Sequence, residues 1–221
     1  TAIALGTYGW TEECAEGGVE LLEQQGYEVL TFHANGMGGR VLEEVVGEGL
    51  VAGAIELSLR EFVDNLLGGT CDAGPSRLEA AGGKGIPYVV APGAIDHIAV
   101  DLTRPLPPRF KRRALHTHNP SVGAVRTTAS EMKKIARALA ARLNKARGPV
   151  AVVIPKRGFS LADREGMFFH DPEVDAAFGE ELCRRLSPRV SLLEVDAHIN
   201  ERPFAEAVAS TFQRLFLAAH R

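Results

Sequence analysis

Hydrophobic and polar residues follow one another along this chain in a pattern that predicts strands and helices in turn. Short, continuously apolar runs, of which residues 150–154 are the clearest, are typical of strands buried on both faces. Longer stretches repeat apolar residues every three or four positions, as in residues 129–145, and predict amphipathic helices. The pattern predicts six strands, at residues 2–6, 27–33, 53–57, 87–91, 150–154 and 190–195. It predicts helices at residues 12–25, 41–48, 60–67, 76–81, 129–145, 174–186 and 203–219.

Strands that alternate with helices form βαβ units. We therefore expect an α/β fold: a Rossmann-like, doubly wound, mostly parallel sheet of about six strands with helices on both faces. A length of 221 residues favours a single domain that covers residues 1–221. Residues 92–118 break the pattern, and the prolines among residues 104–108 predict irregular structure. We expect residues 98–118 to form a flap or an arm that binds a partner.

Composition excludes several classes of protein. A net charge of −3 does not provide the basic surface on which nucleic-acid binding depends. The sequence shows neither an apolar run of about 18 residues nor a signal-peptide pattern, so we expect no membrane partner. The three cysteines are far apart and form no evident disulfide framework, which favours a cytoplasmic location.

Polar residues and glycines gather where the predicted strands end. In an open parallel sheet, ligands bind outside the carboxyl ends of the strands, so we expect one polar pocket there. The candidate binding residues at these ends are Thr7, Gly9, Thr11, Gly36, Gly38, Gly39, Glu61, Gly93, Lys156 and Ser160.

Residues 36–40 (Gly-Met-Gly-Gly-Arg) form the best candidate for an anion site. Glycines allow the backbone to approach a ligand closely, and the N–H groups at a helix start attract phosphate or carboxylate. The segment lacks the Lys-Ser/Thr ending of a P-loop and the GxGxxG spacing of a dinucleotide site, so a plain tight turn is the alternative. Arg126 and Lys156 are suited to neutralise the bound charge.

Histidines and one aspartate are candidates for acid–base chemistry near neutral pH. Asp96 is also a candidate ligand for Mg²⁺ or for a ribose hydroxyl, and a turn cap is the structural alternative. His116 and His118 have a spacing that suits a metal ion, but no third ligand is evident nearby. The candidate catalytic residues are His33, Asp96, His118 and His198.

Several motifs in a fixed order extend over nearly the whole chain. They are residues 26–30, 32–40, 73–81, 85–87, 92–96, 118–120, 126–128, 158–160, 171–173 and 198–200, with Asp163, Gly166 and Phe169. This set resembles the family of the tomato mosaic virus resistance protein and its bacterial relatives, which is described as an ATP-binding domain family. The resemblance implies ATP and Mg²⁺ as ligands. It also implies two consecutive Rossmann-like subdomains, of which this chain is similar to the second. Residues 6–11 and 58–60 depart from the family pattern, the latter by ending in Arg60.

Three functions are compatible with these observations. The leading hypothesis is a domain that binds a nucleotide or phosphate, with glycine-rich loops holding the anion. The second is an enzyme that acts on a small phosphorylated or carboxylated metabolite through histidine and aspartate. The third is an interaction subunit with a vestigial pocket. In each case a separate first subdomain or a second copy of the chain is a possible partner.

Overall fold

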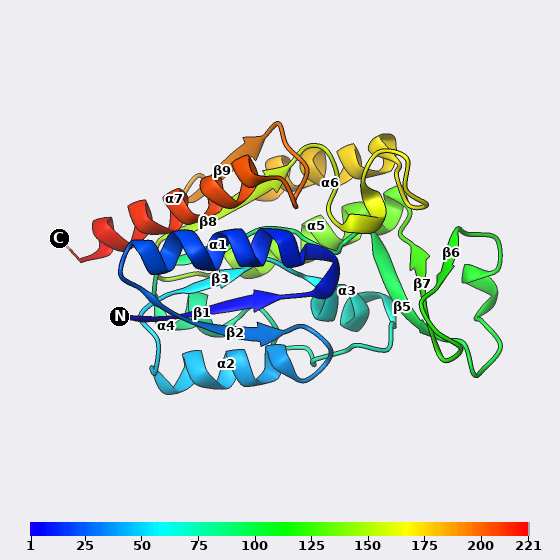
Figure 1. Cartoon of the computed structure of the whole chain (residues 1–221), viewed down its shortest axis with the longest axis horizontal. Coiled ribbons are helices and arrows are strands. Elements are labelled where there is room, and N and C mark those ends of the chain that lie inside the picture. The colour runs from blue at the N-terminus through cyan, green and yellow to red at the C-terminus, as the bar shows by residue number, and fades with distance from the viewer. Residues whose placement is uncertain (221) are drawn as a thin grey trace.

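The computed structural model describes residues 1–220, and six parallel strands form its main sheet. The strands are β1 (Ala2–Thr7), β2 (Glu28–His33), β3 (Ala54–Glu56), β4 (Tyr88–Val90), β8 (Val150–Pro155) and β9 (Val190–Val195). Their spatial order is β2-β1-β3-β4-β8-β9, so β2 and β9 are the edges of the sheet (Figure 1). All six residues of β8 are buried, as its continuous apolar run predicts. The predicted six-stranded α/β fold is confirmed.

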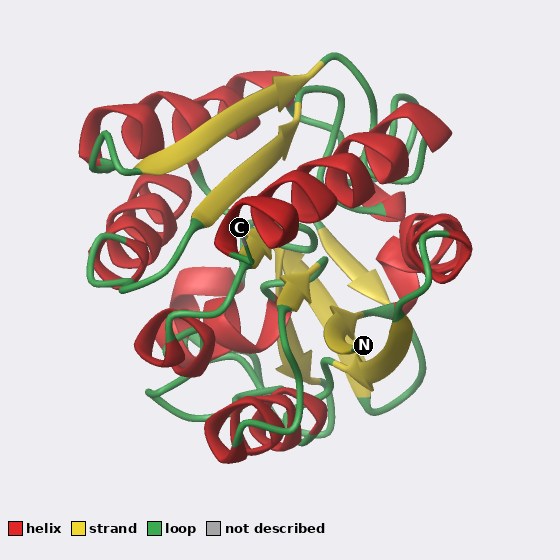
Figure 2. Ribbon diagram, turned by 90° about the vertical axis from the view of Figure 1, so that its left-hand side faces the viewer, coloured by secondary structure: helices red, strands yellow, loops and turns green. Residues whose placement is uncertain are grey.

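Helices cover both faces of this sheet (Figure 2). The first and last helices, α1 (Glu12–Gln24) and α7 (Arg202–Ala219), pack on one face over a core that includes Ile55 and Phe204. The opposite face carries a core around Leu139 and Phe178. The helices on that face are α2 (Gly38–Glu48), α3 (Arg60–Leu67), α4 (Ala80–Lys84), α5 (Ala129–Leu143) and α6 (Pro172–Arg185). The alternation of faces is the doubly wound arrangement.

A second, antiparallel sheet corrects the prediction for residues 92–118. Three strands, β5 (His97–Asp101), β6 (Leu115–Thr117) and β7 (Val122–Arg126), pair in the order β5-β7-β6. The prediction of an irregular segment was wrong because Pro92 precedes β5 and the other three prolines lie in the connection between β5 and β6, with one short turn of helix at Pro108–Phe110. Apolar side chains of β5 and β7, including Ile98 and Val125, are buried in the main core. Figure 1 shows this sheet beyond the carboxyl ends of β1 and β2.

The helix predicted at residues 76–81 begins later, at Ala80. Leu78 has a φ of 69°, a left-handed conformation that a helix cannot include. This conformation accompanies the burial of Arg77 among three acidic side chains, which the sequence pattern does not reveal. No helix within residues 1–220 has both the length and the apolar character needed to cross a membrane.

Candidate functional site

The strand order places a topological switch point between β1 and β3. The chain leaves β1 outward to β2 and then returns across β1 to β3, so the two connections lie on opposite faces of the sheet. Such a point is where open α/β sheets bind their ligands. Tyr8 follows β1 at this point, and Arg60 begins α3 directly after β3. The next loop, after β4, leads to Asp96 and His97.

Arg60 is a buried cation with unused hydrogen-bond donors. Its side chain is 2% exposed, and its Nε and Nη1 atoms have no hydrogen-bond acceptor among residues 1–220. Its guanidinium lies over the ring of Tyr8, with Cζ 4.7 Å from the ring centroid. Within the described residues it forms no ion pair. The nearby charge of Asp64 helps to keep the pKa of Arg60 high in spite of its burial, so what Arg60 lacks is acceptors for two of its donors. Buried donors left unused in this way require an explanation, and an absent ligand is one.

Asp96 and His97 form a fully buried pair beside this cation. His97 Nδ1 lies 3.1 Å from Asp96 Oδ2, and Ser160 Oγ donates to the same oxygen at 2.8 Å. Burial, assisted by the charges of Arg60 and Arg126, lowers the pKa of His97 to about 4 against the attraction of Asp96. The neutral ring therefore carries its proton on Nδ1, and its Nε2 lone pair has no partner in residues 1–220. The pair offers one unused acceptor at the switch point.

Aromatic side chains cover the Asp96–His97 pair. Trp10 approaches His97 with 4.5 Å between ring centroids, and Phe169 stacks on His97 at 6.0 Å. Farther from the pair, His116 of β6 stacks on Phe168 of the loop before α6, with 4.2 Å between ring centroids. We call Trp10, His116, Phe168 and Phe169 together the aromatic cover. It keeps bulk water from the pair and strengthens electrostatic interactions inside.

Arg126 holds the loop before α6 rather than facing open space. It donates to the carbonyl oxygens of Asp96 and Phe169 and forms an ion pair with Asp175, and its Nη2 lies 3.7 Å from Asp163 Oδ1. Burial, together with the nearby charges of Asp96 and Asp175, raises the pKa of Asp163 to about 9, so this carboxyl group is protonated at neutral pH. A phosphate bound by Arg126, as the sequence predicts, would have to replace these contacts.

The glycine-rich segment at residues 36–40 holds a carboxylate of the chain itself. The N–H groups of Gly36 and Gly39 donate to Glu61 Oε1 at 2.7 and 3.1 Å, and Arg77 donates to Glu61 Oε2 at 2.9 Å. A side chain at Gly39 would clash with both Glu61 and Arg77, so the close approach requires glycine. An external anion in this loop would have to displace Glu61.

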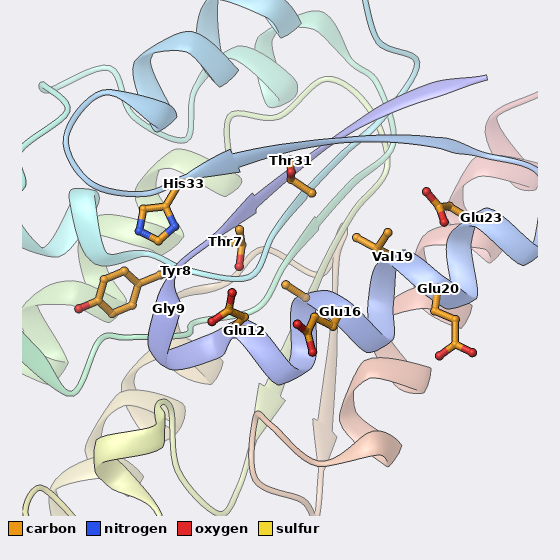
Figure 3. A pocket seen from close by; sticks show the side chains of 11 residues that line it. Thr7, Tyr8, Gly9, Glu12, Glu16, Val19, Glu20, Glu23, Thr31 and His33 are labelled. Carbon is orange, nitrogen blue, oxygen red and sulfur yellow. The ribbon is translucent and has the colours of Figure 1, made fainter.

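Three predicted residues, Thr7, Gly9 and His33, come together in a groove between α1 and β2 (Figure 3). The groove has a volume of about 510 Å³ and is also lined by Tyr8. Four carboxylates of α1 line its wall, which disfavours an anion there: Glu12, Glu16, Glu20 and Glu23.

The other predicted residues are dispersed. His198 is committed to structure, because its Nε2 donates to the Ser160 carbonyl while its Nδ1 accepts from the N–H of Asn200. His118 and Lys156 are exposed, and Lys156 lines a separate cavity near α6. Gly93 and Thr11 are buried against each other, where a side chain at Gly93 would also clash with the Leu57 carbonyl. No group of three metal-ligating side chains occurs in the described part of the chain.

Sequence reasoning missed His97, Tyr8 and Trp10, and it treated Arg60 only as a departure from a family pattern. For each of these residues, one feature of the sequence could have drawn attention to it. His97 directly follows Asp96, Tyr8 and Trp10 flank Gly9 after the first strand, and Arg60 is a cation at the end of the third strand.

Comparison with known proteins identifies the family. Residues 1–216 match the C-terminal domain of the uncharacterised protein family UPF0261. A UPF0261 protein of Clostridium tetani is 39% identical over 203 residues, which are 91% of this chain and 50% of that protein. The tomato mosaic virus (ToMV) resistance protein Tm-1(GCR237) of Solanum lycopersicum is 37% identical over 93% of this chain and 28% of its own length. The chain thus spans half or less of these relatives. It belongs to the UPF0261 C-terminal domain family.

Proposed function

We propose that this domain binds a small anionic ligand at the switch point, with Arg60 as its principal cation. The main support for this proposal is that the buried guanidinium of Arg60 has two nitrogens without a hydrogen-bond acceptor in residues 1–220. Arginine suits phosphate and carboxylate because its planar fork donates two parallel hydrogen bonds.

Tyr8 and Trp10 supply flat apolar surfaces beside this cation. Both are half-buried, and Trp10 lies between His97 and the outer part of the aromatic cover. Because an aromatic ring can stack on a planar group, such a surface is compatible with a nucleotide base. We therefore propose a nucleotide such as ATP as one ligand of this class, as the resemblance of the motifs implies.

Magnesium fits the site only as a companion of phosphate. Asp96 Oδ1 is a buried oxygen without a donor among the described residues, but it belongs to a single carboxylate. Mg²⁺ is commonly held by one or two carboxylates together with substrate phosphates and water. Asp96 would therefore supply one oxygen, and the phosphates of the bound ligand, with water, would supply the others. Because the chain covers about half of its bacterial relatives, we propose that another part of such a protein, or a second copy, completes the pocket.

Thermal denaturation against a panel of anions tests the proposal. The panel holds ATP, ADP, AMP, phosphoenolpyruvate, small dicarboxylates and phosphate, each with and without Mg²⁺. A ligand that binds only the folded state stabilises it by about 2.7 kcal/mol at 100 times its dissociation constant. We expect a rise in melting temperature that Arg60→Gln abolishes and that Arg104→Gln, a change at an arginine 84% exposed, leaves intact.

Two outcomes would refute this function. One is a panel in which no anion raises the melting temperature. The other is a rise that survives in Arg60→Gln, which would place the anion elsewhere, with the glycine-rich segment and Lys156 as the next candidates.

A further inference from the structure

We infer that this chain forms a two-fold dimer in which residues 102–118 of each copy occupy the groove between α1 and β2 of the other copy. We call residues 102–118 the basic arm and this groove the acidic groove. The inference does not depend on the function proposed above, because neither surface includes Arg60, Asp96 or His97.

The acidic groove carries negative charge along one wall. α1 contains five glutamates and no lysine or arginine, and the four that line the groove follow the helix from Glu12 to Glu23 (Figure 3). Residues spaced in this way share one side of a helix, and the row is about 16 Å long at about 1.5 Å per residue. Glu12, Glu16 and Glu23 are exposed and form no ion pair within residues 1–220. The wall therefore presents charge that the described chain does not neutralise.

The acidic groove also offers apolar surface and an open side. Ala15 and Val19 contribute to its lining, and the ring of Tyr8 lies at one end (Figure 3). β2 is an edge of the main sheet, so no further strand of that sheet borders the groove. A volume of about 510 Å³ has room for several side chains. The groove thus suits a segment that brings cations together with an apolar side chain.

The basic arm has that chemistry. It contains five lysines and arginines and no acidic residue. Three of the arginines are engaged within the chain, by two acids and one backbone carbonyl. Lys111 and Arg112 are exposed and form no ion pair in the described part of the chain. Leu115 follows them on β6, an edge strand of the small sheet, and is 43% exposed.

The arrangement of the chain favours a second copy as the source of the arm. Stacking of His116 on Phe168 fixes the base of the arm. Figure 1 shows residues 102–114 at the right-hand end of the molecule, while α1 runs away from them toward the left. The arm therefore points away from the groove of its own chain. A two-fold axis lets two copies exchange arms in the same contact, so that both grooves and both arms are satisfied at once.

The charges also select this contact over the alternative at the same edge. In the arm–groove contact, Lys111 and Arg112 face the row of glutamates and Leu115 covers Val19. Pairing of β2 with β2 of another copy would instead bring two rows of glutamates together, which like charges disfavour.

Sedimentation equilibrium of the whole chain tests the dimer by exchange of charge. In about 50 mM salt, where screening is weak, the wild type should have twice the 23.7 kDa mass of the chain. The groove variant, Glu16→Lys with Glu23→Lys, and the arm variant, Lys111→Glu with Arg112→Glu, should each weaken the dimer by at least about tenfold, because like charges then meet. An equal mixture of the two variants should recover the dimer, because each reversed groove meets a reversed arm.

A matched control separates this contact from a general effect of charge. Glu44→Lys with Glu48→Lys makes the same change at exposed positions of α2 and should leave the dimer intact. All the substituted side chains are exposed, and recovery of the dimer on mixing shows by itself that both variants fold.

Three results would overturn the inference. The first is a monomeric wild type; if that monomer binds oligolysine and the groove variant does not, the groove serves a different basic partner. The second is a dimer that persists in both variants, because its interface then lies elsewhere. The third is a mixture that stays monomeric, because the arm and the groove are then not each other's partners.

Discussion

Replacement of Arg60 by methionine should stabilise the folded protein, which is unusual for a change at a buried position. The guanidinium is 2% exposed and has two nitrogens without an acceptor within residues 1–220. Methionine is unbranched and fills the same space without a charge. Arg126→Met is the matched control, because Arg126 is also buried but donates to three backbone carbonyls and forms an ion pair with Asp175.

The magnitude follows from the contacts. Two buried nitrogens without partners cost about 2–4 kcal/mol in total. Loss of the cation–π contact with Tyr8 offsets about 1 kcal/mol of this gain. Arg60 lowers the pKa of Asp64, which burial raises to about 6, so loss of the cation raises that pKa further, and the part of Asp64 that stays ionised at pH 7 reduces the gain. The net stabilisation is about 1–3 kcal/mol, or roughly 2–12 °C in melting temperature. Arg126→Met should instead lose about 3–5 kcal/mol.

Urea denaturation at pH 7, followed by circular dichroism, measures both variants. The midpoint of Arg60→Met should lie above that of the wild type, with an unchanged slope, while its response to anions disappears. A loss of stability in Arg60→Met comparable to that of Arg126→Met would show that Arg60 is a structural cation. That result would remove the main support for the switch-point site.

Three further predictions concern the buried acidic groups. Arg77→Met should lose at least about 3 kcal/mol by denaturant titration, because three carboxylates lose their common counter-ion; a loss under 1 kcal/mol would contradict this. Gly39→Ala should cost about 2 kcal/mol or more through its clash with Glu61, with Gly47→Ala, at an open helical position, as the tolerated control. The folded-state pKa of Asp163, about 9, lies above its unfolded value, so the folded state binds the extra proton and stability falls as pH rises from about 4 to 9. Asp163→Asn should flatten that slope in denaturation curves at pH 5.5 and 8.5, and an unchanged slope would refute the assignment.

The main sheet could be predicted because each of its strands and helices has a recognisable pattern within its own residues. The apolar run of β8 and the capping box at Thr128, where α5 begins, require no knowledge of distant residues. The small antiparallel sheet escaped prediction because β5 and β6 flank a proline-rich connection, whose local signal of irregular structure hid the strands on either side.

The candidate site was harder to predict because it depends on partners far apart in the sequence. Residues 36–40 carry local signals of a loop that attracts an anion, but they do not show that Glu61 provides a carboxylate there. Likewise, nothing in the sequence around Arg60 indicates that its side chain is buried, or that two of its nitrogens lack a hydrogen-bond acceptor. His97 becomes notable only when Ser160, 63 positions later, is seen to hold its partner Asp96.

The second sheet is inserted in the chain between β4 and β8, so part of the candidate site stands on a segment whose length can vary without changing the main sheet. About twice as many residues separate β4 from β8 as separate β3 from β4. Doubling a loop adds only about 0.6 kcal/mol to its closure entropy. In the connection between β5 and β6, Phe110 is buried in the core, but residues 103–105 are exposed and can therefore lengthen at little thermodynamic cost while the parallel strands persist. The outer wall of the switch point, where β6 places His116, is thus open to remodelling for different ligands on one unchanged scaffold.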